Sequence, residues 1–355
     1  MTPRSSPAAW LAPDRAYDTL LRAAERPGFR AERLPRILYH RRPSAAAERA
    51  IQQQAERQAL AGAIQRRDDV AEVRVMSDSG VFRVVRPVWK QEKVVILIPT
   101  RDRLALLRRA VESLEKKTSY RNFEIVIINN ESRDPETLAW LERSGHEVFN
   151  FPGQFNYAAM HNAAVRATNA PWLLFLNNDT EVIEPDWLTA MAEHVQRPEI
   201  GAVGAKLLFP DGTVQHAGVV LGIQDRAAHA FANLRPDDLS ARAQLQMVRN
   251  YSAVTAACMM MRREVYERIG GMDAERFPVA YNDVELCVRA LRFGYRNLVT
   301  PYAVLKHHEC ASRPRRDNPG EVENLRHTCF GPNGWTDPYY HPALNRAMAD
   351  FSLPL

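Results

Sequence analysis

The sequence predicts an α/β protein with a doubly wound, mostly parallel sheet and helices on both faces. Four continuous apolar runs follow one another from residue 93, as expected of strands that are covered on both sides. These runs are Lys93 to Ile98, Phe123 to Ile128, His146 to Phe151 and Trp172 to Leu176. Strands that alternate with helices over about ninety residues favour parallel pairing through helical crossovers.

Helices are predicted between these runs. Leucine and valine recur at the spacing of one helix face from Leu104 to Leu114, and Pro135 to Arg143 and Ala158 to Ala167 form the next two helices. In the second half, "GAVGAKLLF" and "GTVQHAGVVLG" are typical of strands joined by a turn, and "AVTAACMMM" is another apolar run. An amphipathic helix is then predicted from Asp283 to Phe293.

Composition indicates a soluble protein of the cytoplasm. The chain has 355 residues and 46% of them are apolar, which is ordinary for a globular protein. No run approaches the roughly 18 to 20 apolar residues that cross a bilayer, and the N-terminus lacks the apolar core of a secretory signal. The cysteines have no C-x-x-C spacing, so reduced thiols are expected at Cys258, Cys287, Cys310 and Cys329.

The character of the chain changes at residue 93, which divides it into residues 1–92 and 93–355. The first part has 17 Lys and Arg against 11 Asp and Glu, a balance of +6, and the rest has a balance of −1. A helix over 44–67 and a β-hairpin around Ser77 to Gly80 are predicted there. The basic residues suit either a solvated helix surface or peripheral contact with anionic lipid. No zinc-finger spacing or RNP-like cluster favours nucleic acid.

Polar loops follow each predicted strand: "PTRDR", "NNESRD", "GQFNYAAMHN" and "NND". The carboxyl ends of parallel strands share one edge of a sheet, where ligands bind. Amides and carboxylates at that edge suit a hydroxyl-rich ligand. Neither a G-x-G-x-x-G sequence nor a P-loop is present, so a diphosphate needs a cation or basic side chains. Asp179 is a suitable hard oxygen ligand for Mg²⁺ or Mn²⁺.

Several ordered blocks together resemble family 2 inverting glycosyltransferases, in particular the O-antigen and rhamnan-type enzymes of bacterial surface polysaccharide synthesis. The blocks are "VVILIPTRDR", "FEIVIINNESRDPETLAWL", "FNYAAMHNAAVRATNAPWLLFLNNDTEVIEPDWL", "VGAKLLFPDGTVQHAGVVLG" and "NDVELCVRALRFGYRN". The resemblance covers roughly residues 93–355. It implies the glycosyltransferase A fold, a divalent cation, a UDP-, dTDP- or GDP-linked sugar donor, and a glycan or lipid-linked glycan acceptor.

The same resemblance implies roles for individual residues. Asn177-Asn178-Asp179 occupies the family's D-x-D position, which makes Asp179 a metal ligand and the two amides contacts to ribose or sugar. Asn129 stands where the family often has a base-reading aspartate, so the base stays open. The complete set of donor-binding residues that the resemblance implies is Pro99, Thr100, Arg101, Asp102, Asn129, Ser132, Asn156, Asn162, Asn177 and Asn178.

"AYNDVELCVR" matches the family's E-D-x-x-x-x-x-R element, with Asn282 in place of the glutamate. The resemblance makes Asp283 the general base that takes a proton from the acceptor hydroxyl. A carboxylate at the start of a helix also suits a capping role. In "LKHHECASR", His307 best matches a metal-binding histidine of the family, and His308 could take its place. Adjacent histidines are also common as surface or hydrogen-bonded core residues.

Two other functions fit the same residues. A nucleotidyltransferase shares the sheet and the cation, and "PTRDR" is a partial match to its basic phosphate-binding loop. A catalytically inactive glycan-binding or scaffold domain fits the amides at 129, 177 and 282. The N-terminal stretch "RAERLPRILYHRRPSAAAERA" resembles the last strand and exit linker of an upstream glycosyltransferase domain, which makes residues 1–92 an accessory region or linker remnant.

Overall fold

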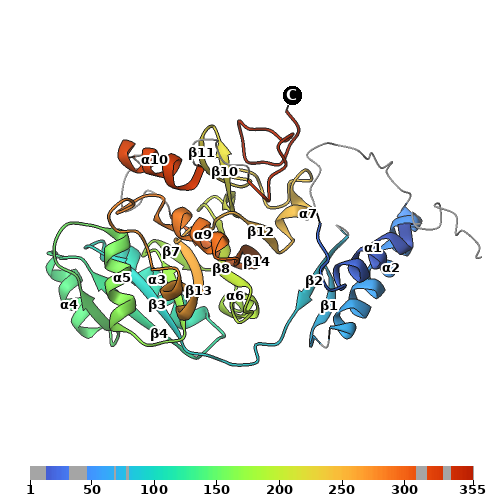
Figure 1. Ribbon diagram of the computed structural model, residues 1–355. Helices are drawn as coiled ribbons and strands as arrows, with labels where there is room; N and C mark the ends of the chain where they lie inside the picture. The colour runs from blue at the N-terminus through green and yellow to red at the C-terminus, as the bar shows by residue number, and fades with distance from the viewer. Residues whose placement is uncertain are drawn as a thin grey trace, which may run out of the picture. The chain divides into compact units, whose positions relative to one another are not determined.

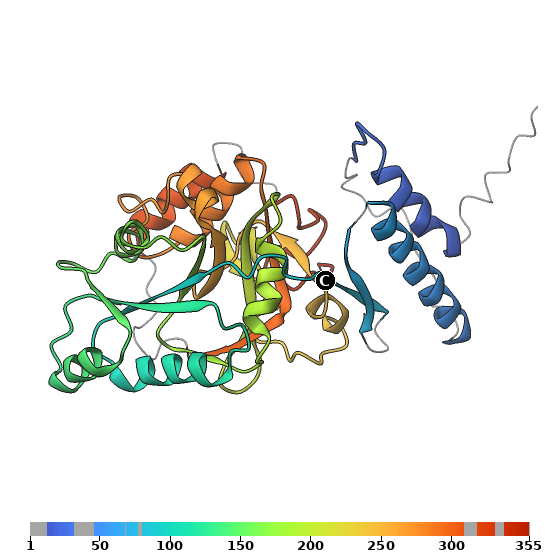
Figure 2. The same ribbon diagram turned by 90° about the horizontal axis from the view of Figure 1, so that it is seen from below.

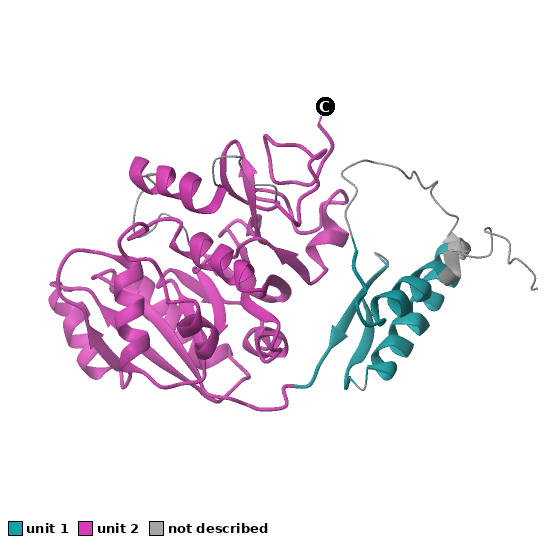
Figure 3. Cartoon of the chain, in the orientation of Figure 1, with its two compact units in different colours: residues 1–87 teal, residues 88–355 magenta. Residues whose placement is uncertain are grey.

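The computed structural model describes residues 13–31, 46–67, 69–76, 80–308, 318–330 and 337–354 (Figure 1). The chain divides into two compact units, Met1–Pro87 and Val88–Leu355 (Figure 3). Most of the stretch that resembles the exit of an upstream domain, residues 32–45, lies outside the described residues. Cys258, Cys287 and Cys329 are buried free thiols, and Cys310 also lies outside the described residues.

The first unit consists of two helices and a β-hairpin. Its elements are α1 (Pro13–Ala24), α2 (Ala46–Arg66), β1 (Glu72–Met76) and β2 (Val81–Val85). Strands β1 and β2 pair antiparallel, so the predicted helix and hairpin are both confirmed. An ion pair joins Arg66 of α2 to Glu25, just after α1, with 2.7 Å between Nε and Oε2.

A mixed sheet forms the centre of the second unit. Its strand order is β12-β14-β8-β13-β6-β3-β4-β5, with β7 paired to β14 and β9 to β8. Four of the seven pairs along this order are parallel, including the whole β6-β3-β4-β5 half. The strands are β3 (Val94–Thr100), β4 (Phe123–Asn129), β5 (Glu147–Asn150), β6 (Trp172–Leu176), β7 (Thr180–Val182), β8 (Ile200–Leu208), β9 (Val214–His216), β12 (Arg249–Tyr251), β13 (Cys258–Arg262) and β14 (Arg296–His307).

Helices cover both faces of this sheet, as Figure 2 shows from below. One apolar cluster packs α3, α4 and α6 on one face, and another packs α5, α8 and α9 on the opposite face. The predicted α/β architecture with helices on both faces is therefore confirmed. The helices are α3 (Leu104–Lys117), α4 (Pro135–Arg143), α5 (Tyr157–Ala167), α6 (Trp187–Val195), α7 (Arg242–Leu245), α8 (Arg263–Arg268), α9 (Asn282–Arg292) and α10 (Pro319–Leu325), followed by a π-helix, Arg326–Phe330.

Strand direction brings many polar loops to one edge of the sheet. Strands β3, β4 and β6 run parallel, so their carboxyl ends lie together. Strand β13 runs antiparallel to β6 with Cys258 opposite Leu176, which brings the residues before β13 to the same edge. Strands β8 and β14 are parallel to each other, and β8 is antiparallel to β13, so His307 at the end of β14 also reaches this edge.

A small hairpin, β10 (Val219–Ile223) with β11 (Arg226–His229), lies beside this edge and is held by the C-terminal segment. The backbone amide of Leu221 donates to Asp337 Oδ2 at 2.8 Å, and that of Phe231 donates to the carbonyl of Ala349 at 3.0 Å. The rings of Phe231 and Phe351 stack with centroids 5.1 Å apart.

Gly218 immediately precedes β10. A glycine is needed there because the backbone has a positive φ and because the ring of Tyr251 leaves no room for a side chain. Its φ is +122°, and a Cβ there would lie 2.4 Å from Cγ of Tyr251. We expect Gly218→Ala to lower the free energy of unfolding by about 3 kcal/mol, roughly 1 from the backbone and about 2 from the overlap. Urea unfolding measures this difference.

Gly212→Ala is the matched control. Gly212 also has a positive φ, +87°, but a Cβ there would meet no atom within 4 Å. It should show only the backbone cost, about 1 kcal/mol. Equal losses in the two variants would contradict the close packing of Tyr251 on Gly218.

Candidate active site

A cavity of about 910 Å³ opens at this edge of the sheet. Its wall combines the loop after β3, the end of β6, the residues before β13, the start of α9 and the hairpin β10–β11. The residues that line it are Pro99–Arg103, Phe155, Tyr157, Asn177–Asp179, Gln215, Val219, Ala227–His229, Thr255–Ala257, Val279–Val284 and His307. Predicted site residues from four separate stretches of the sequence, 99–102, 177–179, 283 and 307, therefore share one cavity.

Asp179 and His307 lie beside each other in this cavity. The Nε2 atom of His307 is 3.0 Å from Asp179 Oδ1, and both side chains are at least 93% buried. The Nδ2 atom of Asn177 is 3.3 Å from the same ring nitrogen. On the other side of the ring, the side-chain amide of Gln215 lies against Nδ1, with its oxygen at 2.9 Å and its nitrogen at 2.7 Å. When the Gln215 oxygen accepts a hydrogen bond from Nδ1–H of His307, the Nε2 atom has no proton and presents its lone pair toward the carboxylate.

This donor set fits a divalent cation that takes its remaining ligands from a diphosphate and from water. It offers one hard carboxylate oxygen and one imidazole nitrogen whose ring is oriented by Gln215. Among the residues that the structure describes, no group of three or more His, Cys, Asp or Glu side chains could hold a metal ion.

His308 has a different environment. Its Nε2 atom lies 3.5 Å from Glu181 Oε2 and 3.5 Å from Arg109 Nη1, and it does not line the cavity. Its backbone amide donates to the carbonyl of Asp179 at 2.9 Å. Of the two predicted histidines, the structure brings His307 to Asp179 and directs the His308 ring to Glu181.

Asp283 lines the same cavity from the first turn of α9. Its Oδ2 accepts from the backbone amide of Ala256 at 2.9 Å, and its Oδ1 accepts from that of Val284 at 2.8 Å. Burial raises the pKa of Asp283 above the ordinary value of 3.8, although these amide donors act in the opposite direction. The N-cap of α9 is Tyr281 and has no side-chain cap, so Asp283 is a first-turn residue that faces the cavity.

The loop after β3 is tied to its neighbours through short hydrogen bonds. Asn178 Nδ2 donates to Thr100 Oγ1 at 3.1 Å, and Asp102 N donates to Ser132 Oγ at 2.8 Å. The Asp102 carboxylate accepts from the amides of Arg133 and Asp134 at 2.7 and 2.9 Å. Pro99, Thr100, Arg101, Asp102 and Asn178 all line the cavity, as predicted for a ligand loop.

Four predicted donor-binding residues, Asn129, Ser132, Asn156 and Asn162, do not line the cavity. The Nδ2 atom of Asn129 donates to Asn150 Oδ1 at 2.9 Å, and its Oδ1 atom accepts from Ser132 N at 3.0 Å. Asn156 caps α5 by accepting from Ala159 N at 2.8 Å.

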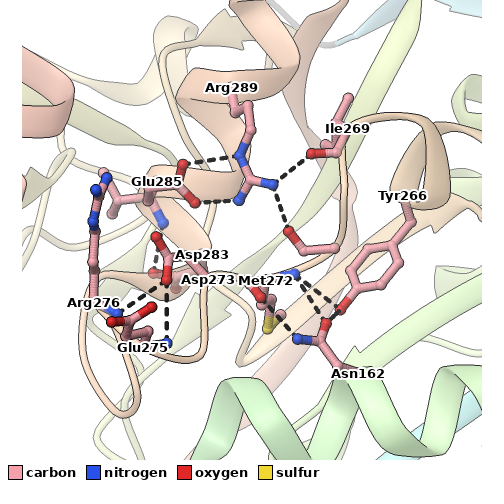
Figure 4. A network of polar contacts seen from close by, with 12 residues as sticks. Asn162, Tyr266, Ile269, Met272, Asp273, Glu275, Arg276, Asp283, Glu285 and Arg289 are labelled. Carbon is pink, nitrogen blue, oxygen red and sulfur yellow. Dashed lines mark hydrogen bonds and ion pairs between the residues drawn. The ribbon is translucent and has the colours of Figure 1, made fainter.

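The side chain of Asn162 forms hydrogen bonds with α8 and with the turn after it (Figure 4). Its Oδ1 accepts from Tyr266 Oη at 2.6 Å and from Met272 N at 3.0 Å, and its Nδ2 donates to the Met272 carbonyl at 2.8 Å. This side chain therefore makes contacts within the chain.

Gln215, His229 and the segment Val279–Tyr281 line the cavity without having been predicted as site residues. His229 Nδ1 lies 2.7 Å from Nδ1 of the buried His216. No motif marks these positions: Gln215 and His229 belong to the short strands β9 and β11, and Val279–Tyr281 belongs to neither a helix nor a strand. Their apolar neighbours, Val219, Ala227 and Ala228, show that this part of the wall is less polar than the loop after β3.

Similarity to known proteins identifies the family of the domain that contains Asp179. Residues 95–270 match the family described as "Glycosyl transferase family 2". This domain belongs to glycosyltransferase family 2. The predicted family is therefore confirmed for residues 95–270, which contribute Asp179 to the cavity, whereas Asp283 and His307 lie C-terminal to the match.

Two curated relatives resemble most of this chain. The "O-antigen biosynthesis protein RfbC" of Myxococcus xanthus is 43% identical over 282 residues, which cover 77% of this chain and 22% of the relative. The "Uncharacterized protein y4gI" of Sinorhizobium fredii (strain NBRC 101917 / NGR234) is 39% identical over 283 residues, covering 77% of this chain and 31% of the relative. The chain thus spans less than a third of the length of either relative.

The fold of the family 2 domain is also found in a solved structure described as "GalNAc-T7 with UDP, GalNAc and Mn2+". It aligns with a TM-score of 0.51 at 14% identity and covers 65% of this chain and 46% of that chain. This likeness confirms the predicted glycosyltransferase A fold. Over the residues that the structure describes, no helix has the length and apolar character that crossing a membrane requires.

Proposed function

We propose that this protein is an inverting glycosyltransferase that moves a sugar from a nucleoside-diphosphate donor to a hydroxyl group of a glycan or lipid-linked glycan in surface polysaccharide synthesis. The observation that carries the proposal is the shared cavity of Asp179 and Asp283. A relative involved by name in O-antigen biosynthesis supports the substrate class. Family membership supports the reaction.

Asp283 is proposed as the general base. An alcohol is a weak nucleophile, and a carboxylate that accepts its proton as the new bond forms increases its reactivity. The two backbone amides fix the Asp283 carboxylate, and its raised pKa makes it a stronger base than an exposed aspartate. Attack on the anomeric carbon from the side opposite the leaving diphosphate inverts that carbon.

Asp179 and His307 are proposed as the protein ligands of a divalent cation, Mn²⁺ or Mg²⁺. An imidazole ligand favours Mn²⁺ of these two. When bound, the cation would neutralise the charge that develops on the leaving diphosphate. Thr100, Arg101, Asp102, Asn177 and Asn178 are proposed to bind the nucleotide and sugar, since these residues line the cavity around that pair.

The outer parts of the chain have proposed roles as well. We assign catalysis to residues 93–355 and an accessory role to residues 1–92. The surplus of basic residues in that first part supports peripheral contact with anionic lipid at the cytoplasmic face of the membrane, where a lipid-linked acceptor would be available.

Donor turnover tests the function directly. The protein is incubated with UDP-, dTDP- and GDP-sugars in the presence of Mn²⁺ or Mg²⁺, with water as the acceptor. A glycosyltransferase should release free sugar and nucleoside diphosphate from its own donor. A nucleotidyltransferase should release neither, and in a parallel incubation with added pyrophosphate it should convert the donor to nucleoside triphosphate and sugar 1-phosphate. An inactive binding domain should do neither. Absence of nucleoside diphosphate with all donors and both cations would refute the proposal.

Removal of the proposed base should separate binding from chemistry. We expect Asp283→Asn to lower the rate of nucleoside-diphosphate release at least about 100-fold, while calorimetric affinity for UDP or GDP with Mn²⁺ changes less than about twofold. Normal turnover by this variant would refute the assignment of Asp283.

The wild-type pH profile provides a second measurement on Asp283. The deprotonated form is active, so turnover should fall as pH decreases through the raised pKa of Asp283. The acid limb of this profile should therefore lie above pH 3.8, the ordinary aspartate value. Nucleotide affinity serves as the control and should not follow that limb. An acid limb at or below 3.8 would contradict the environment of this carboxylate.

The two adjacent histidines form a matched pair for testing the cation site. His307→Ala should weaken Mn²⁺-dependent binding of UDP or GDP about tenfold or more, because it removes the nitrogen beside Asp179. His308→Ala should leave this affinity unchanged, since its ring lies against Glu181. Isothermal titration with and without Mn²⁺ distinguishes them. The reverse order of effects would show that the cation uses His308.

A further inference from the structure

The segment Val279–Tyr281 leads directly into Asp283 and forms part of the cavity wall. It contains an unfavourable backbone conformation, because Tyr281 has φ of +57° and is not a glycine. Asn282 Nδ2 donates to the carbonyl of Val279 at 3.1 Å and closes the turn. A strained residue of this kind keeps its conformation only when surrounding contacts enforce it.

Glu321 provides such contacts from α10. Its Oε1 accepts from the backbone amide of Val279 at 2.7 Å and from that of Ala280 at 2.8 Å. The residue is only 3% exposed. A second side chain of the same helix, Asn324, donates to the carbonyl of Arg276 at 2.9 Å.

Burial makes these contacts important. A carboxylate that leaves water needs strong hydrogen-bond donors, and bonds from amides to an ionised acceptor are stronger than those between neutral groups. In return, Glu321 satisfies two amides of a segment that belongs to neither a helix nor a strand.

Helix α9 is held independently of Glu321, through hydrogen bonds of Arg289 to the turn after α8. Arg289 donates to the carbonyl of Gly271 at 2.7 Å and also to that of Ile269, and it pairs with the carboxylate of Glu285 (Figure 4). These contacts fix α9 to the turn after α8. Loss of Glu321 would therefore release the segment in front of α9 and leave the helix itself in place.

We propose that Glu321 is a positioning residue for catalysis, which holds Val279–Tyr281 so that Asp283 and the cavity wall beside it keep their reactive arrangement. The inference rests on the proposed function. Glu321 lies in α10 (Figure 1), outside the family 2 match at residues 95–270, so this role belongs to the region C-terminal to the matched domain.

Turnover of the donor by water tests the role, with four proteins compared: wild type, Glu321→Ala, Glu321→Gln and Glu323→Ala. Glu321→Ala should lower kcat about tenfold or more, because small displacements of reacting groups are costly. Its KM for the donor and its affinity for UDP or GDP with Mn²⁺ should remain within about twofold, since the contacts around Asp179 are untouched. Glu321→Gln retains an oxygen acceptor and should recover most of the lost kcat.

Glu323→Ala is the control on the same helix. Glu323 is exposed, and its partners among the described residues are local: His327 at 2.8 Å and Arg326 at 3.6 Å. It should match the wild type in kcat. A loss in Glu323→Ala equal to that in Glu321→Ala would attribute the effect to α10 in general and overturn the assignment to Glu321.

Hydrogen exchange measured on the same four proteins is independent of activity. Glu321→Ala should speed amide exchange in peptides that cover residues 279–284, while peptides of β6 and α5 exchange as in the wild type. Unchanged exchange at 279–284, or unchanged kcat in Glu321→Ala, would overturn the inference. If the wild type itself releases no nucleoside diphosphate, the proposed function fails, and exchange alone then decides whether Glu321 holds the segment.

Discussion

A buried carboxylate held by backbone amides is the interaction on which the site depends. Asp283 accepts from the amides of Ala256 and Val284, which belong to the loop before β13 and to α9. Burial of a charge is costly without such donors. The donors are in place only when β13 pairs antiparallel with β6 and α9 begins beside the loop before β13. The same burial makes the carboxylate more basic. The burial that makes the Asp283 carboxylate costly for folding is therefore the same burial that raises its pKa.

The cavity has two kinds of wall with different origins. The carboxyl ends of β3 and β6 provide the polar wall, which is rigid because these strands are wholly buried. The opposite wall consists of the hairpin β10–β11 and the segment 279–281, which are short and irregular. Both are fixed by carboxylates from the C-terminal part of the chain, Asp337 and Glu321, that accept backbone amides. The sheet therefore fixes one wall of the cavity, which is the donor side under the proposed function, and the C-terminal region fixes the hairpin and the segment 279–281.

The sequence was sufficient for the alternating strands and helices from β3 to β6 and for the positions of Asp179 and Asp283, because buried parallel strands have long apolar runs and polar residues end them. It did not predict β14, α8 or α10, and the predicted strand "GTVQHAGVVLG" is divided into β9 and β10. It was insufficient to choose between His307 and His308. Successive strand residues point to opposite faces, so the choice required the register of His307 opposite Thr180. It also failed to separate Asn162, whose amide is engaged within the chain, from Asn178 at the cavity. Glu321 is 42 residues from Val279 and belongs to no motif.

The amides at positions 177, 178 and 282 bear on whether the site is active or only binds glycans. Asn282 uses its Nδ2 to donate to the Val279 carbonyl, which a carboxylate could not do. Asn178 likewise donates to Thr100, and this bond connects the end of β6 to the loop after β3. These amides therefore shape the cavity, and they add no negative charge near a diphosphate. Under the proposed function, charge is needed at positions 179 and 283, and both carry carboxylates, which is the distribution expected of a working transferase.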